Sequence, residues 1–325
     1  MHVYWFQDSK QGHINQVKVL LDELARDADL DFQVSAISCK SNWLQRMLQR
    51  FGASDKISPK TNMVMLIGAG HGTYPSILEA RKILQKSHSV LTVAVLKPSR
   101  NIQEFDVVYA PAHDFYNELK PTNVTTFMGS LAPTSEQAVD SSQAIICLGG
   151  NSHHYKFDTK IAIKQIAYLL MTHPTLQFSI FNSRRTPAGL TQQITELNEM
   201  HKNYSFYDHI SVSNTIFMQK LHASNLKFIT PDSVNLVFEA LSSPGKTYLM
   251  QIESPLSNVF FKKKKIRRLM VSLVRDRHVG VVKVRDELSN KVLISSIEQP
   301  SLYFEPLEEV KKVAFALKKI IQEKL

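Results

Sequence analysis

Short apolar runs alternate with longer helical patterns along most of this chain, and this alternation constrains its fold more than any other feature. The runs are rich in β-branched and aromatic residues. In the first half they cover residues 2–6, 32–37, 63–67, 91–96, 107–110 and 125–128. Strands that alternate with helices form parallel sheets through crossover connections. We therefore expect an α/β protein.

The helical patterns between these runs have the spacing of one buried face. Residues 15–28 carry apolar side chains at Val17, Leu20, Leu21, Leu24 and Ala25, as an amphipathic helix does. The second half repeats the alternation, with strands at 144–148, 177–182 and 246–251, helices at 159–171 and 187–200, and a strand, turn and helix at 228–241.

The length favours two domains, because 325 residues exceed the usual size of a single core. A polar, strand-poor stretch follows Gly129 and contains Ser141 and Ser142, so we expect the linker there. The expected ranges are 1–135 for a first Rossmann-like domain and 142–305 for a second. Residues 306–325 are expected to form an amphipathic helix that starts at Pro306.

Composition is ordinary for a soluble protein, with 43% hydrophobic and 21% charged residues. No apolar run reaches the roughly 18 residues that a membrane span needs, and no charged-then-apolar leader precedes the first strand. Cys39 and Cys147 cannot build a disulfide framework, which fits a reducing compartment. We expect a cytoplasmic protein, peripheral at most to the inner membrane.

The net charge of +10 points towards anionic partners. Part of it is one basic run with apolar flanks, made of Lys262, Lys263, Lys264, Lys265, Arg267 and Arg268. Such a run is expected to contact anionic membrane lipid, and a solvated loop or helix face is the alternative. Nucleic acid is a weaker candidate, because stacking aromatics are not interleaved with the cations.

The segment 228–241, FITPDSVNLVFEAL, is expected to suit a nucleotide-sugar. Asp232 or Ser233 can cap its helix, and a helix start seats a phosphate. Glu239 lies six residues past Ser233, roughly 9 Å along the axis, where its carboxylate could accept hydrogen bonds from both hydroxyls of a ribose. The alternative is a capped helix with a solvated glutamate.

Two further turns of the second domain follow strands and precede helices. One is Gly149, Gly150, Asn151 and Ser152, followed by His153 and His154, which resembles a backbone cradle for a diphosphate. The other contains Arg184 and Arg185, which suit bidentate phosphate contact. A surface ion pair is the alternative for the arginines.

Turns of the first domain bring histidines to the same edge of the expected sheet. His13 follows Gly12 after the first strand and precedes Asn15; His71 follows Gly70 after the third. A histidine there can act as a base, as an acid or as a hydrogen-bond donor to a phosphate. The alternative is that the glycines serve only the tight turns. The exit of the fourth strand adds Lys97, and the fifth adds His113 and Asp114.

Several other chemistries lack their motifs. The chain has no G-x-S-x-G elbow, no complete P-loop, no H-E-x-x-H and no cysteine pair at metal spacing. We expect no metal and no cofactor, with a nucleoside-diphosphate sugar as substrate. A metal site at His153 and His154 is a minor alternative, since no third ligand lies nearby in sequence.

Six separate sequence blocks, in a fixed order, resemble the mitochondrial-fission family founded by the plant protein named for elongated mitochondria. Bacterial members of this family are also described as predicted nucleoside-diphosphate-sugar epimerases. The blocks are QGHINQ at 11–16, IGAGHGTYPSILEARK at 67–82, LKPS at 96–99, LGGNSHHYKFD at 148–158, NSRRTP at 182–187 and TPDSVNLVFEAL at 230–241. The resemblance implies a GT-B glycosyltransferase-like fold. Two Rossmann-like lobes with parallel sheets would face a central cleft, and the terminal helix would cross back to the first lobe.

The resemblance also implies roles for residues in both lobes. In the second lobe, the nucleotide-sugar would be bound by Gly149, Gly150, Asn151, Ser152, Arg184, Arg185, Thr230, Asp232, Ser233, Val234 and Glu239. In the first lobe, the acceptor side would comprise Gly12, His13, Asn15, Gly70, His71 and Lys97, with His13 and His71 as candidate bases. The chain departs from the family at Gly72, where a polar residue such as arginine is expected.

Three functions remain open at this stage. The first is a metal-independent, inverting GT-B transferase that acts on a cell-envelope acceptor at the cytoplasmic membrane face, with helix ends and arginine stabilising the leaving diphosphate. The second is a sugar-nucleotide 2-epimerase, for which His113, Asp114 and Glu118 offer a partial set. The third is a non-catalytic, membrane-recruited scaffold, because a fold persists more readily than an activity.

Overall fold

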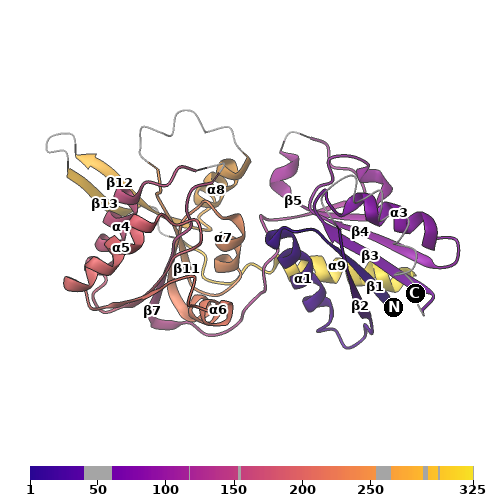
Figure 1. The fold of residues 1–325 in the computed structure, drawn as a ribbon, viewed down its shortest axis with the longest axis horizontal. Coiled ribbons are helices and arrows are strands. Elements are labelled where there is room, and N and C mark those ends of the chain that lie inside the picture. The colour runs from indigo at the N-terminus through magenta and orange to yellow at the C-terminus, as the bar shows by residue number, and fades with distance from the viewer. Residues whose placement is uncertain are drawn as a thin grey trace. The chain divides into compact units, whose positions relative to one another are not determined.

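The structure, a computed structural model, describes residues 1–39, 61–116, 118–152, 155–253, 265–287, 292–298 and 301–324. It divides the chain into two units, of which the first joins Met1–Pro133 to Glu308–Leu325 and the second is Thr134–Leu307. Each unit has its own sheet (Figure 1). Both sheets are built mainly of parallel strands with crossover helices, as the alternation predicted.

The first unit is a parallel sheet in the order β2-β1-β3-β4-β5-β6. Its elements are β1 (His2–Gln7), α1 (Gln11–Leu24), β2 (Gln33–Ser38), β3 (Met63–Ala69), α3 (Tyr74–Leu84), β4 (Ser89–Val95), β5 (Val107–Pro111), the short η3 (Ala112–Phe115), β6 (Val124–Phe127) and α9 (Glu309–Lys324). The chain leaves β1 towards β2 and returns to β3 on the other side. The carboxyl ends of β1 and β3 therefore form a topological switch point, where α/β sheets bind ligands.

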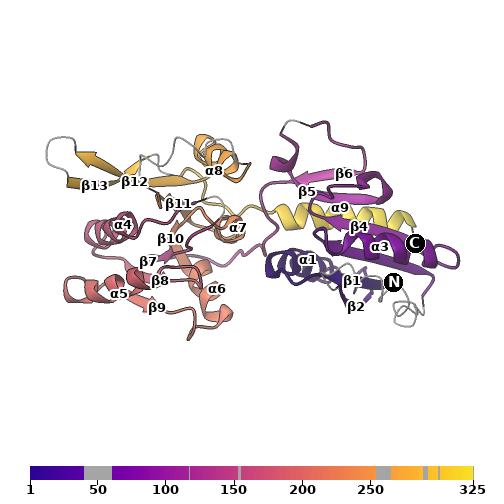
Figure 2. The same ribbon diagram turned by 45° about the horizontal axis from the view of Figure 1, so that its top comes forward.

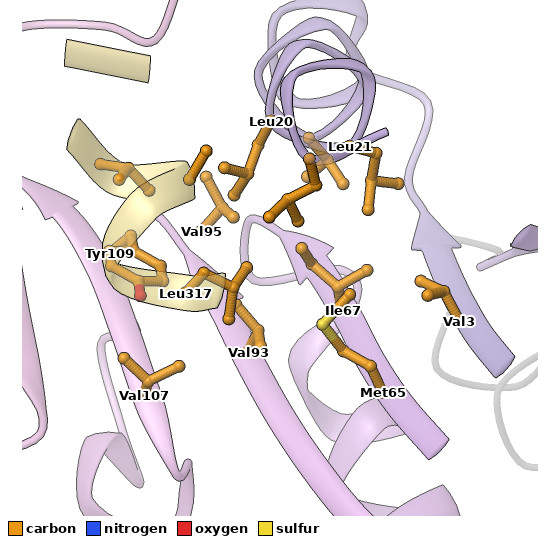
Figure 3. Close-up of a cluster of buried hydrophobic side chains, with 14 of the residues drawn as sticks. Val3, Leu20, Leu21, Met65, Ile67, Val93, Val95, Val107, Tyr109 and Leu317 are labelled. Carbon is orange, nitrogen blue, oxygen red and sulfur yellow. The ribbon is translucent and has the colours of Figure 1, made fainter. Parts of the chain in front are cut away.

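Period-two alternation divides the core of this unit between the two faces of the sheet. In β3, Met65 and Ile67 pack with α1 and α9, whereas Val64 and Leu66 pack with α3. Figure 3 shows Leu317 of α9 beside Val93 and Tyr109, on the face that also receives Leu20 of α1. A sheet covered on both faces explains why its strands are almost wholly apolar.

The last helix, α9, is part of the first unit. Lys318 pairs with Asp27 at 2.5 Å and Asp29 at 3.0 Å, and Glu309 accepts a hydrogen bond from the Met128 amide at 2.7 Å. The helix begins at Glu309, so the expectation that Pro306 starts it is wrong by three residues. The Glu309 side chain ties this first turn back to the end of β6.

The second unit has the sheet order β13-β12-β11-β10-β7-β8-β9, in which β12 and β13 are antiparallel. Its elements are β7 (Asp140–Cys147), α4 (Thr159–Thr172), β8 (Gln177–Phe181), α5 (Ala188–Glu196), β9 (Tyr204–Tyr207), α6 (Asn214–Ala223), β10 (Ser224–Ile229), α7 (Val234–Leu241), β11 (Lys246–Met250), α8 (Lys265–Arg275), β12 (Gly280–Glu287) and β13 (Val292–Glu298). Figure 2 shows α4 and α5 on one side of this sheet and α6 and α7 on the other. Its switch point lies between β7 and β10.

Some element boundaries differ from the sequence expectations. Helix α1 begins at Gln11, not at residue 15, because Asp8 stabilises its entry turn by accepting a hydrogen bond from the Lys10 amide at 3.0 Å. Strand β7 begins at Asp140, so Ser141 and Ser142 belong to the sheet and not to a linker. The sequence patterns also did not reveal β9, α6, α8, β12 and β13.

The basic run of the sequence is only partly described. Lys262, Lys263 and Lys264 lie outside the described residues, whereas Lys265 and Arg268 are exposed on α8. Arg267 is buried and forms an ion pair with Glu253 at 2.6 Å. The expected lipid contact through Arg267 is therefore wrong, because that guanidinium is committed to the interior. No helix within the described residues has the length and apolarity to span a membrane.

A buried lysine joins the centre of the second sheet to the end of α7. Lys227 on β10 is fully buried, and its Nζ donates to the carbonyls of Ala240, Ser243 and Pro244 at 3.0, 2.9 and 2.6 Å. Burial lowers the pKa of Lys227 to about 7. These carbonyls close the last turn of α7 and the loop after it, where a helix leaves acceptors unsatisfied. Lys227 thus fixes the position of α7.

Substitution of Lys227 by Met is expected to lower the free energy of unfolding by about 3 kcal/mol, because buried carbonyls lose their donor. Lys246→Met, at an exposed position on β11, serves as the matched control and should change it by less than about 0.5 kcal/mol. Urea denaturation measures both. Equal effects of the two substitutions would contradict the role assigned to Lys227.

Candidate functional site

The glycine pair after β7 lies at the switch point of the second sheet. The Gly149 amide donates to Thr230 Oγ1 at 2.7 Å, and the Gly150 amide donates to Asp232 Oδ2 at 3.1 Å. A Cβ at Gly149 would lie 2.1 Å from the Asp232 carboxylate, and one at Gly150 would lie 1.8 Å from the Arg185 carbonyl oxygen. The glycines are therefore needed for close packing. The expectation that their amides face a diphosphate is wrong, because both already donate within the protein.

Asp232 is the centre of this packing. Its side chain is fully buried, accepts a hydrogen bond from the Thr230 hydroxyl at 2.7 Å and pairs with Arg185 at 2.7 Å. A buried carboxylate requires several donors, and these come from the loops after β7, β8 and β10. Thr230, Asp232 and Arg185 thus hold the loops together, which corrects their expected role as ligand contacts.

Asn151 and Ser152 continue the loop after the glycines. Asn151 Oδ1 accepts a hydrogen bond from the Phe157 amide at 2.9 Å, and the Ser152 amide donates to the Tyr155 carbonyl at 3.0 Å. Both residues therefore stabilise a turn of the loop itself. His153 and His154, the minor metal candidate, lie outside the described residues.

The start of α7 faces the same edge of the sheet. Ser233, and not Asp232, caps this helix, since its Oγ accepts a hydrogen bond from the Leu236 amide at 3.4 Å. Val234 is the first residue of the helix. The positive end of the helix dipole is therefore directed to the carboxyl edge of β10. Of the expected donors to a diphosphate, this helix end and Arg184 remain.

A pocket of about 370 Å³ opens within the second unit at the ends of β7 and β8. Its lining combines apolar and polar side chains, as is common for small-molecule sites. The residues are Cys147, Leu148, Phe181, Asn182, Ser183, Arg184, His209, Val212, Ser213, Asn214, Phe217 and Leu236. Arg184 was predicted from the sequence, but the wall contributed by the β9–α6 segment was not, because no strand was expected before it.

Polar contacts fix one wall of this pocket. Asn182 Oδ1 accepts a hydrogen bond from the His209 amide at 2.7 Å, and Asn182 Nδ2 donates to Asp208 Oδ2 at 3.3 Å. The Phe181 ring packs edge-on against Phe217, with 5.2 Å between ring centroids. The end of β8 and the β9–α6 segment are thus joined independently of any ligand.

Glu239 lies one turn past Leu236 on α7, next to this pocket. Its side chain is half-buried, and burial raises its pKa to about 7. Its charge reaches the pocket-lining Cys147, where it adds to burial in raising the pKa of the thiol. Within the described part of the chain, the carboxylate has no hydrogen-bond donor.

At the switch point of the first sheet, Asp8 and His13 form a close pair. His13 Nδ1 lies 2.7 Å from Asp8 Oδ2, and the two side chains are 22% and 11% exposed. A carboxylate at this distance orients the ring and favours the proton on Nδ1. Nε2 then remains as an acceptor. Asp8 was not among the predicted site residues, although it stands five residues before His13 and directly follows β1.

The glycine-rich turn after β3 makes room for this pair. Gly70 has φ of +84°, and a Cβ there would lie 2.2 Å from His13 Nδ1. A Cβ at Gly72 would lie 3.1 Å from the Asp8 Cβ. Glycine at position 72, where the family resemblance suggested a polar residue, therefore accommodates Asp8. His71 is exposed and packs edge-on against Tyr74.

The other acceptor-side candidates have different environments. Asn15 Oδ1 accepts a hydrogen bond from Gln11 at 2.7 Å, and the Gly12 carbonyl accepts one from Gln16 at 3.5 Å. Lys97 forms an ion pair with Glu118, donates to the Asp114 carbonyl at 3.1 Å and lies over the Phe115 ring. Lys97 was expected to contact the acceptor substrate, but it contacts residues in η3 and Glu118 after it instead.

The residues suggested for epimerase chemistry, His113, Asp114 and Glu118, lie in and just after η3. His113 is buried, with 7% exposure, and the Glu118 carboxylate is paired with Lys97. Within the described residues, no group of three or more His, Cys, Asp or Glu side chains is arranged to hold a metal ion.

Substitutions of the two arginines after β8, Arg184 and Arg185, should differ in their effect on the free energy of unfolding. Arg185→Met is expected to lower the free energy of unfolding by about 2 kcal/mol, because it removes a donor from buried Asp232. Adding Asp232→Asn should restore at least about 1 kcal/mol, since the uncompensated charge disappears. Arg184→Met, the adjacent exposed control, should change stability by less than about 0.5 kcal/mol. Strict additivity in urea denaturation would contradict the pairing.

Comparisons with known proteins extend over the whole chain. The sequence profile of the family described as Mitochondrial fission ELM1 matches residues 11–321. No curated protein matches. A putative UDP-N-acetylglucosamine 2-epimerase from Listeria monocytogenes has a TM-score of 0.52 at 10% identity, with 99% of this chain and 97% of that chain covered.

Two further solved structures have the same fold. The UDP-GlcNAc 2-epimerase from Neisseria meningitidis, bound to UDP-GlcNAc, has a TM-score of 0.51 at 13% identity over 99% of this chain and 100% of that chain. MnaA from S. aureus with UDP has a TM-score of 0.52 at 11% identity over 100% and 97%. At such identities the likeness shows the fold, which is GT-B, as predicted. The profile match over residues 11–321 shows that the chain belongs to the Mitochondrial fission ELM1 family.

Proposed function

We propose that this protein is a nucleotide-sugar-dependent glycosyltransferase whose second unit binds the donor. The pocket takes the base, Glu239 binds the ribose, and Arg184 with the start of α7 binds the diphosphate. Glu239 carries the proposal, because a half-buried carboxyl to which none of the described residues donates a hydrogen bond suits the two hydroxyls of a ribose. It lies six residues past Ser233, about 9 Å along the helix, which fits the separation of ribose and diphosphate.

The comparisons support a nucleotide-sugar as the ligand. UDP-GlcNAc or UDP occupies two of the solved structures that share this fold. The fold alone does not carry an activity, so the choice of reaction rests on side chains of this chain.

The Asp8–His13 pair favours transfer to a hydroxyl. With its Nδ1 proton held by Asp8, His13 presents Nε2 as a general base for the acceptor. The acceptor oxygen then attacks the anomeric carbon, and the bond to the departing diphosphate breaks. Arg184 and the dipole of α7 stabilise the negative charge that develops on the leaving group.

An epimerase is less well supported. Of its candidate groups, His113 is buried away from solvent and Glu118 pairs with Lys97. The proposal includes a cell-envelope acceptor met at the cytoplasmic face of the membrane. That part rests on the family resemblance and on the net charge of +10.

Nucleotide binding is expected to strengthen as pH rises through the pKa of Glu239, which is about 7 in the free protein. Ribose hydroxyls donate to the ionised carboxylate, so binding lowers this pKa. Affinity for the preferred diphosphate among those of uridine, guanosine, adenosine and cytidine should rise about tenfold from about pH 6 to about pH 8. Isothermal titration calorimetry measures it.

Glu239→Gln isolates this effect from titration of the diphosphate itself. The variant should bind about tenfold more weakly at about pH 8, and it should keep only the pH dependence that the ligand brings. Glu199→Gln, an exposed position after α5, is the matched control. If none of the four diphosphates binds, or if Glu239→Gln follows the wild-type profile, the nucleotide site is refuted.

His13→Ala is expected to lower transfer about 10² to 10⁴-fold with little change in diphosphate affinity, because a general base acts only on the reaction. The assay follows diphosphate release from nucleotide-sugars when a cell-envelope extract supplies acceptors. Asp8→Asn should also lower the rate, whereas His71→Ala should change it less than tenfold.

Two outcomes would favour the other functions. Sugar interconversion without extract would indicate an epimerase. Tight nucleotide binding without turnover in any extract would leave the scaffold as the better description.

A further inference from the structure

Helix α8 presents cations on one face because another cation anchors its opposite face. Arg267 pairs with buried Glu253 at 2.6 Å and lies over the Tyr155 ring, with 4.5 Å from guanidinium carbon to ring centroid. Leu269 and Met270 are buried with it. The helix therefore cannot rotate without breaking a buried ion pair, which costs several kcal/mol.

The outward face follows from this anchor. Lys265, Arg268, Val271 and Arg275 are all exposed at spacings of three, three and four residues, as one face of a helix requires. Val271 is 67% exposed although it is apolar. In sequence, Lys262, Lys263 and Lys264 precede the helix directly.

An apolar segment adjoins the end of this helix. The Leu302 amide donates to the Arg277 carbonyl at 3.1 Å, and the Tyr303 ring stacks on His278 with 4.0 Å between centroids. Leu302, Tyr303 and Phe304 are 64%, 43% and 39% exposed. Three successive exposed apolar residues are unusual on a soluble protein surface. We name Arg268, Val271, Arg277, Leu302, Tyr303 and Phe304 the α8 surface.

We propose that the α8 surface docks on a bilayer that contains anionic lipid. Cations beside exposed aliphatic and aromatic side chains match the interface, where the charges meet headgroups and the apolar groups enter the acyl boundary. A nucleic acid would leave Leu302 and Phe304 in water. The exposed carboxylates nearby are Asp276, which pairs with Arg275 at 2.7 Å, and Glu305.

The α8 surface differs from the basic run predicted from the sequence in which residues it contains and in its larger share of apolar side chains. It excludes Arg267 and adds an apolar component from residues 302–304. It also stands independently of nucleotide binding, because none of the six residues lines the pocket of the second unit.

The test is cosedimentation of the full chain with vesicles of phosphatidylcholine alone or with about one third phosphatidylglycerol. Binding is expected to the anionic vesicles, to weaken at about 0.5 M salt, and to be weak with neutral vesicles. Arg268→Glu combined with Arg277→Glu should lower the partition coefficient at least about thirtyfold. Lys160→Glu with Lys164→Glu, exposed on α4, makes the same charge change and should lower it much less.

A second variant tests the apolar component without altering charge. Val271→Ser with Leu302→Ser should lower binding to anionic vesicles at least about tenfold, and both residues are exposed enough for the fold to tolerate the change. Thermal unfolding confirms that the variants fold. Equal binding to neutral vesicles, equal losses for the α4 pair, or a bound complex with protein but no vesicle would overturn the proposal.

Discussion

The buried carboxylate of Asp232 is the interaction on which the second unit's switch point depends. It accepts hydrogen bonds from Gly150 and Thr230 and pairs with Arg185, so three loops that are distant in sequence converge on one charge. An isolated buried carboxylate would be too costly, and the loops must close on it before any ligand arrives. Arg184, the start of α7 and Glu239 do not take part in these contacts with Asp232, and they are the groups that the proposed donor site uses.

The first unit also has a carboxylate, that of Asp8, which orders the polar groups at the switch point of its sheet. Asp8 accepts from the Lys10 amide and pairs with His13, while Gly70 and Gly72 remove the side chains that would collide with the pair. In both units, glycines at a switch point make space for a carboxylate that orders the neighbouring polar groups. The results differ between the units. In the second unit Asp232 joins three loops, whereas in the first unit Asp8 orients His13 so that Nε2 is the acceptor nitrogen of the ring.

Periodicity was enough to predict the fold class, because buried parallel strands such as β3 are continuous apolar runs and α1 has a single apolar stripe. It did not reveal β9 or β12, which carry alternating or polar residues that also suit loops. The site was less accessible, because a glycine pair after a strand has the same sequence whether its amides bind a phosphate or a carboxylate of the protein. Likewise, Arg184 and Arg185 are adjacent and chemically identical, and only the position of Asp232 assigns one to structure.

Glu239 decides between a binding site and a vestige. Its folded-state pKa of about 7 is above the ordinary value for glutamate, so the native state holds a proton that the unfolded chain has lost over the interval between them. The contribution of Glu239 to stability therefore falls as pH rises from about 4.5 to about 7, because over this interval the unfolded chain has lost the proton that the native state retains. A scaffold that bound no nucleotide would be more stable with an apolar residue at this position. In the proposed donor site, the ribose diol would offset this penalty, because its two hydroxyls would donate to a carboxylate that receives no hydrogen bond from the described residues.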